Sequence, residues 1–505
     1  MNLRIACVGG GPGGLFFAAL VKQAHPDVEI TVFERNRAED TFGFGVVFSD
    51  ATLAGINAAD PVLRTALDDF GVHWDDIEVR VQGQRFGCGG NGMTAIVRKT
   101  LLQLLQERAI AAGVDVRFST EVTVDELDGY DLVVACDGAN SAIRERFADD
   151  FAPSFETATA KFIWFGTTYE FDGLTFVHER GEHGVFAVHG YPIAPGLSTF
   201  IVETDEETWR RAGLDEFDTS QPPGASDMLS KEYLEKLFAE QIDGHPLVIN
   251  NSRWANFRTR RAERWTRGNI ALLGDAAHTA HFSVGSGTKM AMEDAIALAT
   301  ALGEHPDDVP AALAAYEASA RPPVEKIQGS ARPSLAWWEH FGRYHDTLEP
   351  WQFAFHFLSR SIGAEKLERR DGDFVAASRA SWKASKGTDV LASDFRLGRH
   401  TLAGRRVALD DVRRTGVRLL EVEAPEAEAD LDTVRQRFYD GLEEKPELVI
   451  VRGGSALCRT LLSEEARLAA GIPTLRVEPE ASDDVVETLV LSGRADLVAE
   501  ESADD

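Results

Sequence analysis

Three glycines near the start of the chain are spaced for binding the phosphates of a dinucleotide. Gly9, Gly11 and Gly14 form the pattern G-x-G-x-x-G between a short apolar run and a stretch with helical periodicity. Glycines at these positions let the backbone approach a pyrophosphate at the N-terminus of a helix. Glu34 follows at the end of the next apolar run, where its carboxylate can accept hydrogen bonds from ribose hydroxyls. The pattern therefore predicts a dinucleotide site.

Two aspartates farther along the chain indicate that the dinucleotide is FAD rather than NAD. Asp137 opens the segment DGANSAIR after the apolar run 132–135, and Asp275 lies in GDAAH after the run 269–273. Each carboxylate would stand at the carboxyl end of a strand, where open α/β sheets bind their ligands. Either motif alone is as typical of an ordinary turn or helix cap as of a ligand site. In this order, together with the glycine pattern, they form a specific signature.

The whole arrangement resembles the class A flavoprotein aromatic hydroxylases, which share the fold of para-hydroxybenzoate hydroxylase. The resemblance implies that Asp137 serves the flavin and the nicotinamide cofactor, and that Asp275 contacts the ribityl-pyrophosphate region of FAD. It also implies that Arg98 faces the FAD phosphates, and that the turn 285–288 faces the flavin pyrimidine, where negative charge develops on reduction. The predicted FAD contacts are Gly9, Gly11, Pro12, Gly13, Gly14, Glu34, Arg35, Arg98, Val122, Asp137, Asp275, Gly285, Ser286, Gly287 and Thr288.

Two segments narrow the resemblance to one branch of these hydroxylases. Residues 41–50 and 277–289 look like the branch that contains salicylyl-CoA 5-hydroxylase and anthraniloyl-CoA monooxygenase, and the resemblance extends from residue 1 to about 385. The branch departs from most relatives after Asp275, with Lys289 where they have an asparagine. The resemblance therefore implies a substrate that is an aromatic CoA thioester.

Hydroxylation of a phenol or aniline is helped by a base that raises electron density on the ring. The predicted catalytic residues are His281, His189 and Tyr191, and His278 beside the flavin motif is an alternative base. A packed, hydrogen-bonded histidine is the structural alternative at each of these positions. No metal site is predicted, because the flavin explains His278 and His281 better than a pair of metal ligands does.

Five arginines between residues 258 and 267 form a basic run in an acidic chain. Such a run suits charge-assisted hydrogen bonds to the phosphates of CoA, and a solvated, salt-bridged strand edge is the alternative. Phe48 lies in the branch-specific segment 41–50. The predicted substrate contacts are Phe48, Arg258 and Arg260.

Alternating strand-like and helix-like stretches must position these residues. The apolar runs 4–8, 29–33 and 132–135 alternate with helical stretches, which is the pattern of a doubly wound parallel sheet, and residues 96–112 are predicted to form a helix. Aromatic-rich strands after residue 155 indicate an inserted antiparallel sheet. The predicted α/β fold comprises a doubly wound FAD-binding domain of GR2-type Rossmann topology (1–155 and 261–310), a substrate domain (156–260), a helical segment (311–388) and a small acidic C-terminal α/β domain (389–505).

The length of the C-terminal domain excludes a complete (β/α)₈ barrel. In bifunctional relatives an FMN-binding barrel of this kind follows the hydroxylase, and segments 394–397 and 492–498 faintly resemble its two ends. A barrel needs about 250 residues, roughly twice the length of this domain. We therefore expect a small open sheet that binds no FMN. A structural thioredoxin-like tail without a CxxC pair is the alternative.

Charge and composition limit the partners of the chain. Its 505 residues carry 82 acidic and 52 basic side chains, a net charge of −30, which disfavours nucleic acid and anionic membrane surfaces. The four cysteines form no CxxC pair and are expected to be reduced thiols, and no apolar run is long enough to predict a membrane span. We expect a cytoplasmic protein, and a homodimer is an open alternative.

Together these features predict an FAD-dependent monooxygenase that uses NADH or NADPH and O₂. The resemblance implies that it converts salicylyl-CoA to gentisyl-CoA through a flavin C4a-hydroperoxide. Anthraniloyl-CoA or a free aromatic acid is the alternative substrate, and a non-catalytic flavin-binding protein that docks a partner is the alternative class. A second Rossmann fingerprint and a redox cysteine pair are both missing, which argues against the disulfide reductases that bind two dinucleotides.

Overall fold

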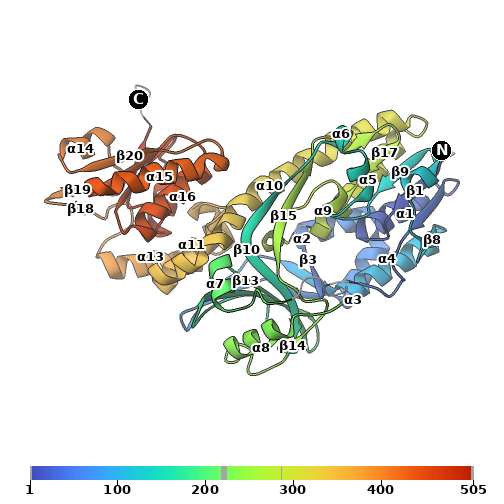
Figure 1. Cartoon of the computed structure of the whole chain (residues 1–505), viewed down its shortest axis with the longest axis horizontal. Helices are drawn as coiled ribbons and strands as arrows, with labels where there is room; N and C mark the ends of the chain where they lie inside the picture. Colours follow the sequence, from blue (N-terminus) through green and yellow to red (C-terminus); the bar gives the residue numbers. More distant parts are fainter. Residues whose placement is uncertain (1–2, 42, 218–223, 286, 502–505) are drawn as a thin grey trace. The chain divides into compact units, whose positions relative to one another are not determined.

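A computed structural model describes residues 3–41, 43–217, 224–285 and 287–501, and it divides the chain into two compact units (Figure 1). The first unit comprises Met1–Ile77 and Asn91–Glu339, and the second comprises Glu78–Gly90 and His340–Asp505. The division into four segments expected from the sequence stays a prediction. No helix within the described residues has the length and apolar character needed to cross a membrane.

The first unit is built on a six-stranded sheet with the order β16-β17-β9-β1-β2-β8. All neighbours pair in parallel except β16 and β17. The central strands are buried, as expected where helices cover both faces of a parallel sheet. The predicted doubly wound sheet is confirmed. Its elements are β1 (Arg4–Val8), α1 (Pro12–Ala24), β2 (Glu29–Phe33), α4 (Arg98–Ala112), β8 (Asp115–Arg117), β9 (Leu132–Ala135), β16 (Thr266–Arg267), β17 (Ile270–Leu272) and α9 (Gly287–Glu304).

The same unit contains the predicted antiparallel sheet, in which β14, β10, β13, β12 and β11 are neighbours in that order and β15 also pairs with β10. Strands β10, β11, β12 and β13 are long and rich in aromatic and β-branched residues, which suit a pleated, packed surface. Their bounds are β10 (Pro153–Thr167), β11 (Leu174–Gly181), β12 (Gly184–Ala194), β13 (Leu197–Thr204), β14 (Leu247–Val248) and β15 (Ala255–Ala262).

The two faces of this sheet differ in chemistry. Side chains alternate between the faces of a strand, so Phe200 and Val202 point one way while Ile201 and Glu203 point the other. The apolar face packs with helix α8 (Met228–Leu237) into a core that includes Phe186, Leu234 and Phe238. The opposite face carries His189, Tyr191 and Glu203, because directly paired residues of antiparallel strands share a face.

A three-stranded antiparallel sheet was not anticipated from the sequence. Strands β3 (Gly45–Ser49) and β4 (Val72–Trp74) both pair with β7 (Met93–Val97). The predicted helix 96–112 is therefore wrong at its start, because Ile96 pairs with Val46 in this sheet and the helix begins at Arg98. In the chain, the helices α2 (Asp50–Ala59) and α3 (Pro61–Phe70) connect β3 to β4.

The second unit contains a parallel sheet with the sequential order β20-β21-β22-β23. Four parallel strands joined by helices form the small open α/β sheet that was predicted. The unit also contains the hairpin strands β18 (Phe395–Leu397) and β19 (His400–Leu402). The remaining bounds are α11 (Pro350–Leu358), α12 (Ala364–Arg370), α13 (Gly372–Lys386), α14 (Leu409–Arg414), β20 (Leu419–Glu423), α15 (Leu431–Gly441), β21 (Leu448–Arg452), α16 (Ala456–Glu464), β22 (Thr474–Glu478), α17 (Asp483–Leu491) and β23 (Leu497–Glu500).

Candidate active site

The glycine loop between β1 and α1 is closely packed on one side and open on the other. Gly9 has a φ of +115°, and a Cβ atom there would lie 2.2 Å from the carbonyl oxygen of Cys136. A Cβ atom on Gly14 would lie 2.5 Å from the carbonyl oxygen of Gly9. A Cβ atom on Gly11 would meet nothing within 4 Å. The loop therefore presents backbone and open space at the N-terminus of α1, which fits a pyrophosphate.

Glu34 ties the end of β2 to the glycine loop. Its carboxylate accepts hydrogen bonds from the backbone N–H of Gly10 at 2.7 Å and of Asn36 at 2.8 Å. The backbone N–H of Thr120 donates to the carbonyl of Glu34, which brings the loop containing the half-buried Val122 to the end of β2. Arg35 lies exposed beside Glu34 in the chain. The carboxylate is held where a ribose bound beside the glycine loop would lie, as predicted for this position.

Asp137 serves partly as a helix cap. One carboxylate oxygen, Oδ2, accepts a hydrogen bond from the N–H of Ala142 at 2.8 Å, at the start of α5 (Ala142–Arg146). The other oxygen, Oδ1, is buried and has no hydrogen-bond partner among the described residues. Buried polar atoms in native proteins are normally paired. The unpaired oxygen at the carboxyl end of β9 therefore fits a role in contacting a ligand.

Asp294 of α9 holds the turn that carries Asp275 through contacts with the residues on either side of it. Asp294 Oδ2 accepts a hydrogen bond from the N–H of Gly274 at 2.9 Å and lies 2.7 Å from His278 Nε2. Asp275 is exposed to solvent on one side. The protein around the rest of its carboxyl group partly desolvates that group and raises its pKa, while the charges of His278 and Arg98 act in the opposite direction. Asp294 was missed by the sequence reasoning, because a single acidic residue inside a helix carries no local signal.

Arg98 is a half-buried cation that forms no hydrogen bond or ion pair through its side chain with any described residue. Burial lowers the pKa of its guanidinium, and the charges of Asp275 and Tyr191 act in the opposite direction. A buried cation without a partner is costly unless a ligand supplies the counter-charge. The open side of Gly11, the unpaired oxygen of Asp137 and this free guanidinium therefore fit a dinucleotide with a pyrophosphate.

The glycine-rich turn before α9 is open to a ligand. Gly285 has a φ of +60°, and a Cβ atom on Gly285 or Gly287 would meet nothing within 4 Å. Helix α9 begins at Gly287 and includes Thr288, so its first backbone N–H groups lie at this turn. Ser286 lies outside the described residues. The expected contact of this turn with the flavin stays a prediction.

Two of the predicted catalytic histidines meet at one buried carboxylate. Glu203 Oε1 lies 3.1 Å from His189 Nε2 and 3.6 Å from His281 Nε2. Their exposed fractions are 1% for Glu203, 3% for His189 and 2% for His281. Glu203 was missed by the sequence reasoning, although a charged residue in the apolar strand 198–203 was an available signal.

His281 is further oriented on its other nitrogen. Ser283 donates its backbone N–H to His281 Nδ1 at 3.3 Å, and the Ser283 hydroxyl lies 2.8 Å from the same nitrogen. The Ser283 hydroxyl also lies 3.0 Å from that of Ser334. Because Nδ1 accepts from the backbone, the proton of a neutral His281 ring lies on Nε2, toward Glu203. Aromatic rings surround the histidine pair: Phe176, Phe257, Phe282 and Trp338.

Tyr191 lies on the same sheet face as His189, where its ring stacks on Trp74 at a centroid distance of 6.2 Å. Burial raises the pKa of its phenol to about 12, although the Arg98 guanidinium acts in the opposite direction. The phenol is therefore protonated near neutral pH. This favours the histidines over Tyr191 as the base, and the catalytic assignment of all three stays a prediction.

The arginine run divides into two groups. Arg261 pairs with Glu156 at 3.0 Å and Arg267 with Asp150 at 2.5 Å, while Arg264 donates to backbone carbonyls, so these three side chains stabilise the strand edge. Arg260 donates to the Asn140 side chain at 3.2 Å, and the guanidinium of Arg258 lies 5.8 Å from the ring centroid of Phe155. Neither of these two forms an ion pair within the described ranges. Arg258 and Arg260 thus stay available for an anionic ligand.

Phe48 lies in the hydrophobic core of the first unit and is 1% exposed. The same core includes Leu53 and Ile96. Packing alone accounts for a buried phenylalanine at this position, and the predicted contact between Phe48 and the substrate stays a prediction.

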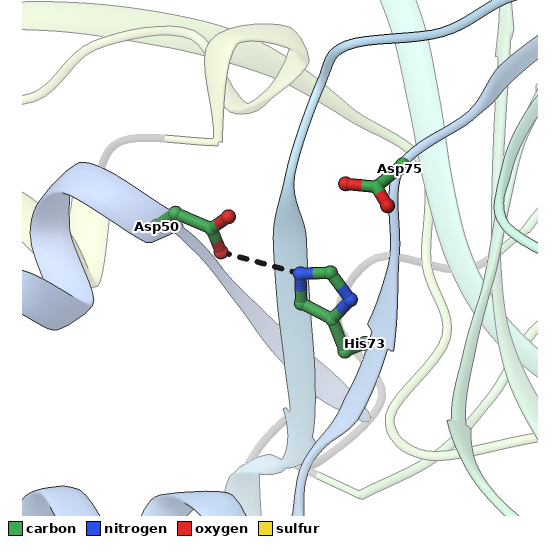
Figure 2. A group of neighbouring side chains, drawn as sticks. All are labelled: Asp50, His73 and Asp75. Carbon is green, nitrogen blue, oxygen red and sulfur yellow. Dashed lines mark ion pairs between the residues drawn. The ribbon is translucent and has the colours of Figure 1, made fainter.

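One group of side chains within the described residues has ligand atoms close enough to hold a metal ion (Figure 2). The group consists of Asp50 at the start of α2, His73 of β4, and Asp75 just after the end of β4, and their ligand atoms lie within 4.8 Å of one another. His73 Nε2 lies 3.3 Å from Asp50 Oδ1. All three are exposed. Exposed groups of this kind are common without an ion, so we assign no metal here.

Comparisons with known proteins agree with this geometry. The model of the family described as FAD binding domain matches residues 2–330. The chain is 58% identical to salicyloyl-CoA 5-hydroxylase of a Streptomyces species, with 98% of this chain and 99% of that protein covered. It is 36% identical to 3-hydroxy-4-methyl-anthranilyl-(aryl-carrier protein) 5-monooxygenase of Streptosporangium sibiricum, with 66% of this chain and 89% of that protein covered.

Two solved structures show the same fold. One is 2-methyl-3-hydroxypyridine-5-carboxylic acid oxygenase, with a TM-score of 0.54, 20% identity, and coverage of 67% of this chain and 93% of that chain. The other is PqsL of Pseudomonas aeruginosa, with a TM-score of 0.54, 22% identity, and coverage of 68% of this chain and 98% of that chain. These likenesses confirm the predicted fold class.

Proposed function

This chain belongs to the FAD binding domain family, and on that premise we propose that it is an FAD-dependent monooxygenase that hydroxylates salicyloyl-CoA at the 5-position to gentisyl-CoA. The observation that carries the proposal is the identity of 58% with a salicyloyl-CoA 5-hydroxylase over 98% of the chain. O₂ supplies the oxygen atom that enters the ring, and NADH or NADPH supplies the two electrons that reduce the other oxygen atom to water.

Bound FAD would supply the reduction and oxygen-activation chemistry, so the residues of the chain have to bind, orient and protect the reactants. The glycine loop and the N-terminus of α1 would hold the pyrophosphate, with Arg98 as counter-charge. Glu34 would hold a ribose. Asp275, kept in place by Asp294, would contact the ribityl-pyrophosphate region.

The substrate would lie against the polar face of the antiparallel sheet. His189 is enclosed there by aromatic rings, which would exclude water from a substrate ring bound beside them. An ionised phenol raises electron density at the position para to its oxygen, which is the 5-position of a salicyloyl group. Arg258 and Arg260 would bind phosphates of CoA by charge-assisted hydrogen bonds.

The test is oxidation of NADH and NADPH by the FAD-loaded chain, with the product identified by mass spectrometry. Salicyloyl-CoA, anthraniloyl-CoA and free salicylate are compared at equal concentration. We expect salicyloyl-CoA to stimulate oxidation most and to yield a product that is heavier by one oxygen. Preference for salicylate would contradict a CoA thioester substrate, and preference for anthraniloyl-CoA would move the assignment to that substrate. Flavin without stimulated oxidation by any of the three would favour a binding protein.

Two further predictions concern the state of the protein. We propose that it acts in the cytoplasm and that its C-terminal domain binds no FMN, and a homodimer is an open alternative for its oligomeric state. Size-exclusion chromatography with light scattering tests the oligomeric state. Acid release of the flavin followed by chromatography distinguishes FAD alone from FAD with FMN.

A further inference from the structure

Phe155 of β10 is a large apolar side chain that is 66% exposed. It pairs directly with Arg260 of β15, and Thr157, the next residue on the same face of β10, pairs with Arg258. Directly paired residues of antiparallel strands share a face, so Phe155, Arg258 and Arg260 stand on one face of the two strands, which run side by side (Figure 1). We call these three residues the ring–arginine platform.

The positive charge of the platform is open to an anion. Neither Arg258 nor Arg260 forms an ion pair with a carboxylate in the part of the chain that the structure describes, and the Arg258 guanidinium lies 5.8 Å from the ring centroid of Phe155. On the opposite face of β15, by contrast, Arg261 pairs with Glu156 at 3.0 Å. In a chain with a net charge of −30, two neighbouring cations without a carboxylate partner suit an anionic ligand.

Arg260 connects the platform to the cofactor site. Its guanidinium donates to the Asn140 side chain at 3.2 Å, in the segment that follows Asp137. It also interacts electrostatically with Arg144 and with Asp275, the residue expected to contact FAD. A molecule that extends from Phe155 past Arg260 would therefore reach the region that binds the flavin.

On the basis of the function proposed above, we propose that the ring–arginine platform binds the adenosine diphosphate moiety of a co-substrate. The exposed ring of Phe155 offers a face on which the adenine stacks, as aromatic side chains do with nucleic-acid bases. The two guanidinium groups donate charge-assisted hydrogen bonds to the phosphates. Arg258 and Arg260 are two residues apart, about 7 Å along the strand, so they can contact different phosphate groups.

Two co-substrates of the proposed reaction carry this moiety. The CoA thioester joins it to a pantetheine arm and adds a phosphate on the ribose, while NADH or NADPH joins it to nicotinamide riboside. The shared chemistry is an adenine linked through ribose to a pyrophosphate, and the platform recognises that part of either molecule. Kinetics with each co-substrate distinguish the two sources.

The first measurement is direct binding to the FAD-loaded full-length chain, in which the FAD site is already filled. ADP and inorganic pyrophosphate are titrated calorimetrically into wild type, Phe155→Leu, Phe155→Trp and Arg258→Ala. The matched control is Phe70→Leu, because Phe70 of α3 is 56% exposed and lies in the same unit. Phe155 is an exposed side chain, so its replacement should leave the fold and the FAD content unchanged.

We expect Phe155→Leu to weaken the binding of ADP about tenfold, and Phe155→Trp to retain it, because the base loses its stacking partner only in the first variant. Pyrophosphate has no base, so its affinity should stay the same in Phe155→Leu and fall in Arg258→Ala. Phe70→Leu should behave as wild type. Wild type that does not bind ADP, or Phe155→Leu with the affinity of wild type, would overturn the proposal.

Steady-state kinetics of the same variants identify the source of the moiety. A KM that rises in Phe155→Leu for salicyloyl-CoA alone assigns the platform to the CoA thioester. A KM that rises for NADH or NADPH alone assigns the platform, with Arg258 and Arg260, to the reductant. Unchanged KM values for both co-substrates would overturn a role of the platform in the reaction.

Failure of this inference is distinguishable from failure of the proposed function. Wild type that oxidises NAD(P)H no faster with salicyloyl-CoA would overturn the proposed function, while the ADP titrations would still report on the platform. Stimulated oxidation by wild type together with unaltered ADP binding in Phe155→Leu would overturn this inference alone.

Discussion

Asp294 and His278 form a buried pair in which His278 Nε2 lies 2.7 Å from Asp294 Oδ2, and each side chain is 2% exposed. The same carboxylate oxygen accepts the N–H of Gly274. One residue of α9 thus holds both ends of the turn that presents Asp275.

Asp294→Ala should destabilise the protein by about 3 kcal/mol, because removing one partner of a buried pair leaves the other polar groups without compensation. FAD should also bind more weakly, since the turn that carries Asp275 loses its anchor. Asp294→Asn retains an acceptor for the Gly274 N–H and should lose less of both. Urea unfolding and FAD fluorescence titration measure the two quantities. FAD affinity equal to wild type in Asp294→Ala would contradict the anchoring role.

Asp275→Ala should lose most of its bound FAD while the far-UV circular dichroism stays that of wild type. Asp275 is exposed to solvent and does not pack in the core, so its removal should not disturb the fold. Its carboxylate is available to contact the ligand, so FAD binding should be lost. The control is Asp69→Ala, because Asp69 is an exposed carboxylate of α3 in the same unit. The flavin-to-protein absorbance ratio after gel filtration is the measurement. A normal ratio in Asp275→Ala would refute the assigned contact.

Arg98→Gln should separate cofactor affinity from stability. The half-buried Arg98 guanidinium forms no ion pair with any described carboxylate, so its removal should leave the free energy of unfolding of the FAD-free form unchanged or slightly higher. The affinity for FAD should fall about tenfold or more, because a charge-assisted contact with phosphate is lost. Thermal unfolding with and without FAD reports both effects. Equal shifts of Tm in the two forms would speak against a phosphate contact.

Arg258→Ala and Arg260→Ala should raise KM for the CoA thioester more than they lower kcat. Both guanidinium groups are free of carboxylate partners among the described residues, so they can bind phosphate without breaking an ion pair. Arg267→Ala is the control, because Arg267 is occupied by Asp150. Steady-state kinetics with salicyloyl-CoA measures the effect. A KM that responds equally in all three variants would argue that the run is only structural.

The second unit should lose stability in mild acid. His356 Nε2 lies 3.1 Å from Glu464 Oε1, and burial together with the Arg494 charge lowers the pKa of His356 to about 4. Burial alone would raise the pKa of Glu464, but His356 and Arg494 hold it at about 2. Unfolding lets the histidine take up a proton near pH 6.5, so the unfolded state binds more protons than the native state between about pH 6.5 and 4.

The stabilisation from His356 is therefore present above pH 6.5 and is lost as the pH falls toward 4, at a cost of at most about 3 kcal/mol. Denaturant unfolding of the full chain at several pH values measures this slope. His356→Gln keeps a donor toward Glu464 but does not titrate, so its stability should fall less over the same range. An identical slope in both proteins would exclude His356 as the titrating group.

Local patterns were enough to identify the FAD domain. The strands Arg4–Val8, Glu29–Phe33 and Leu132–Ala135 have the predicted bounds, because continuous apolar runs next to glycine loops specify buried parallel strands with few alternatives. The predicted family is likewise confirmed by the comparisons. The start of the helix at Arg98 was misplaced, because Ile96 satisfies a helical spacing as well as the strand pairing with β3 that only the folded chain reveals.

The sequence by itself determined the class of cofactor, since glycines, a ribose-binding carboxylate and strand-end aspartates act over short stretches of chain. Only the tertiary structure decided which polar groups share a site. Glu203, His189 and His281 come from two strands and a distant turn, and Asp294 reaches His278 from the following helix. Their meeting depends on strand register and helix packing, which bring together residues far apart in sequence and leave no mark in the spacing of any one segment.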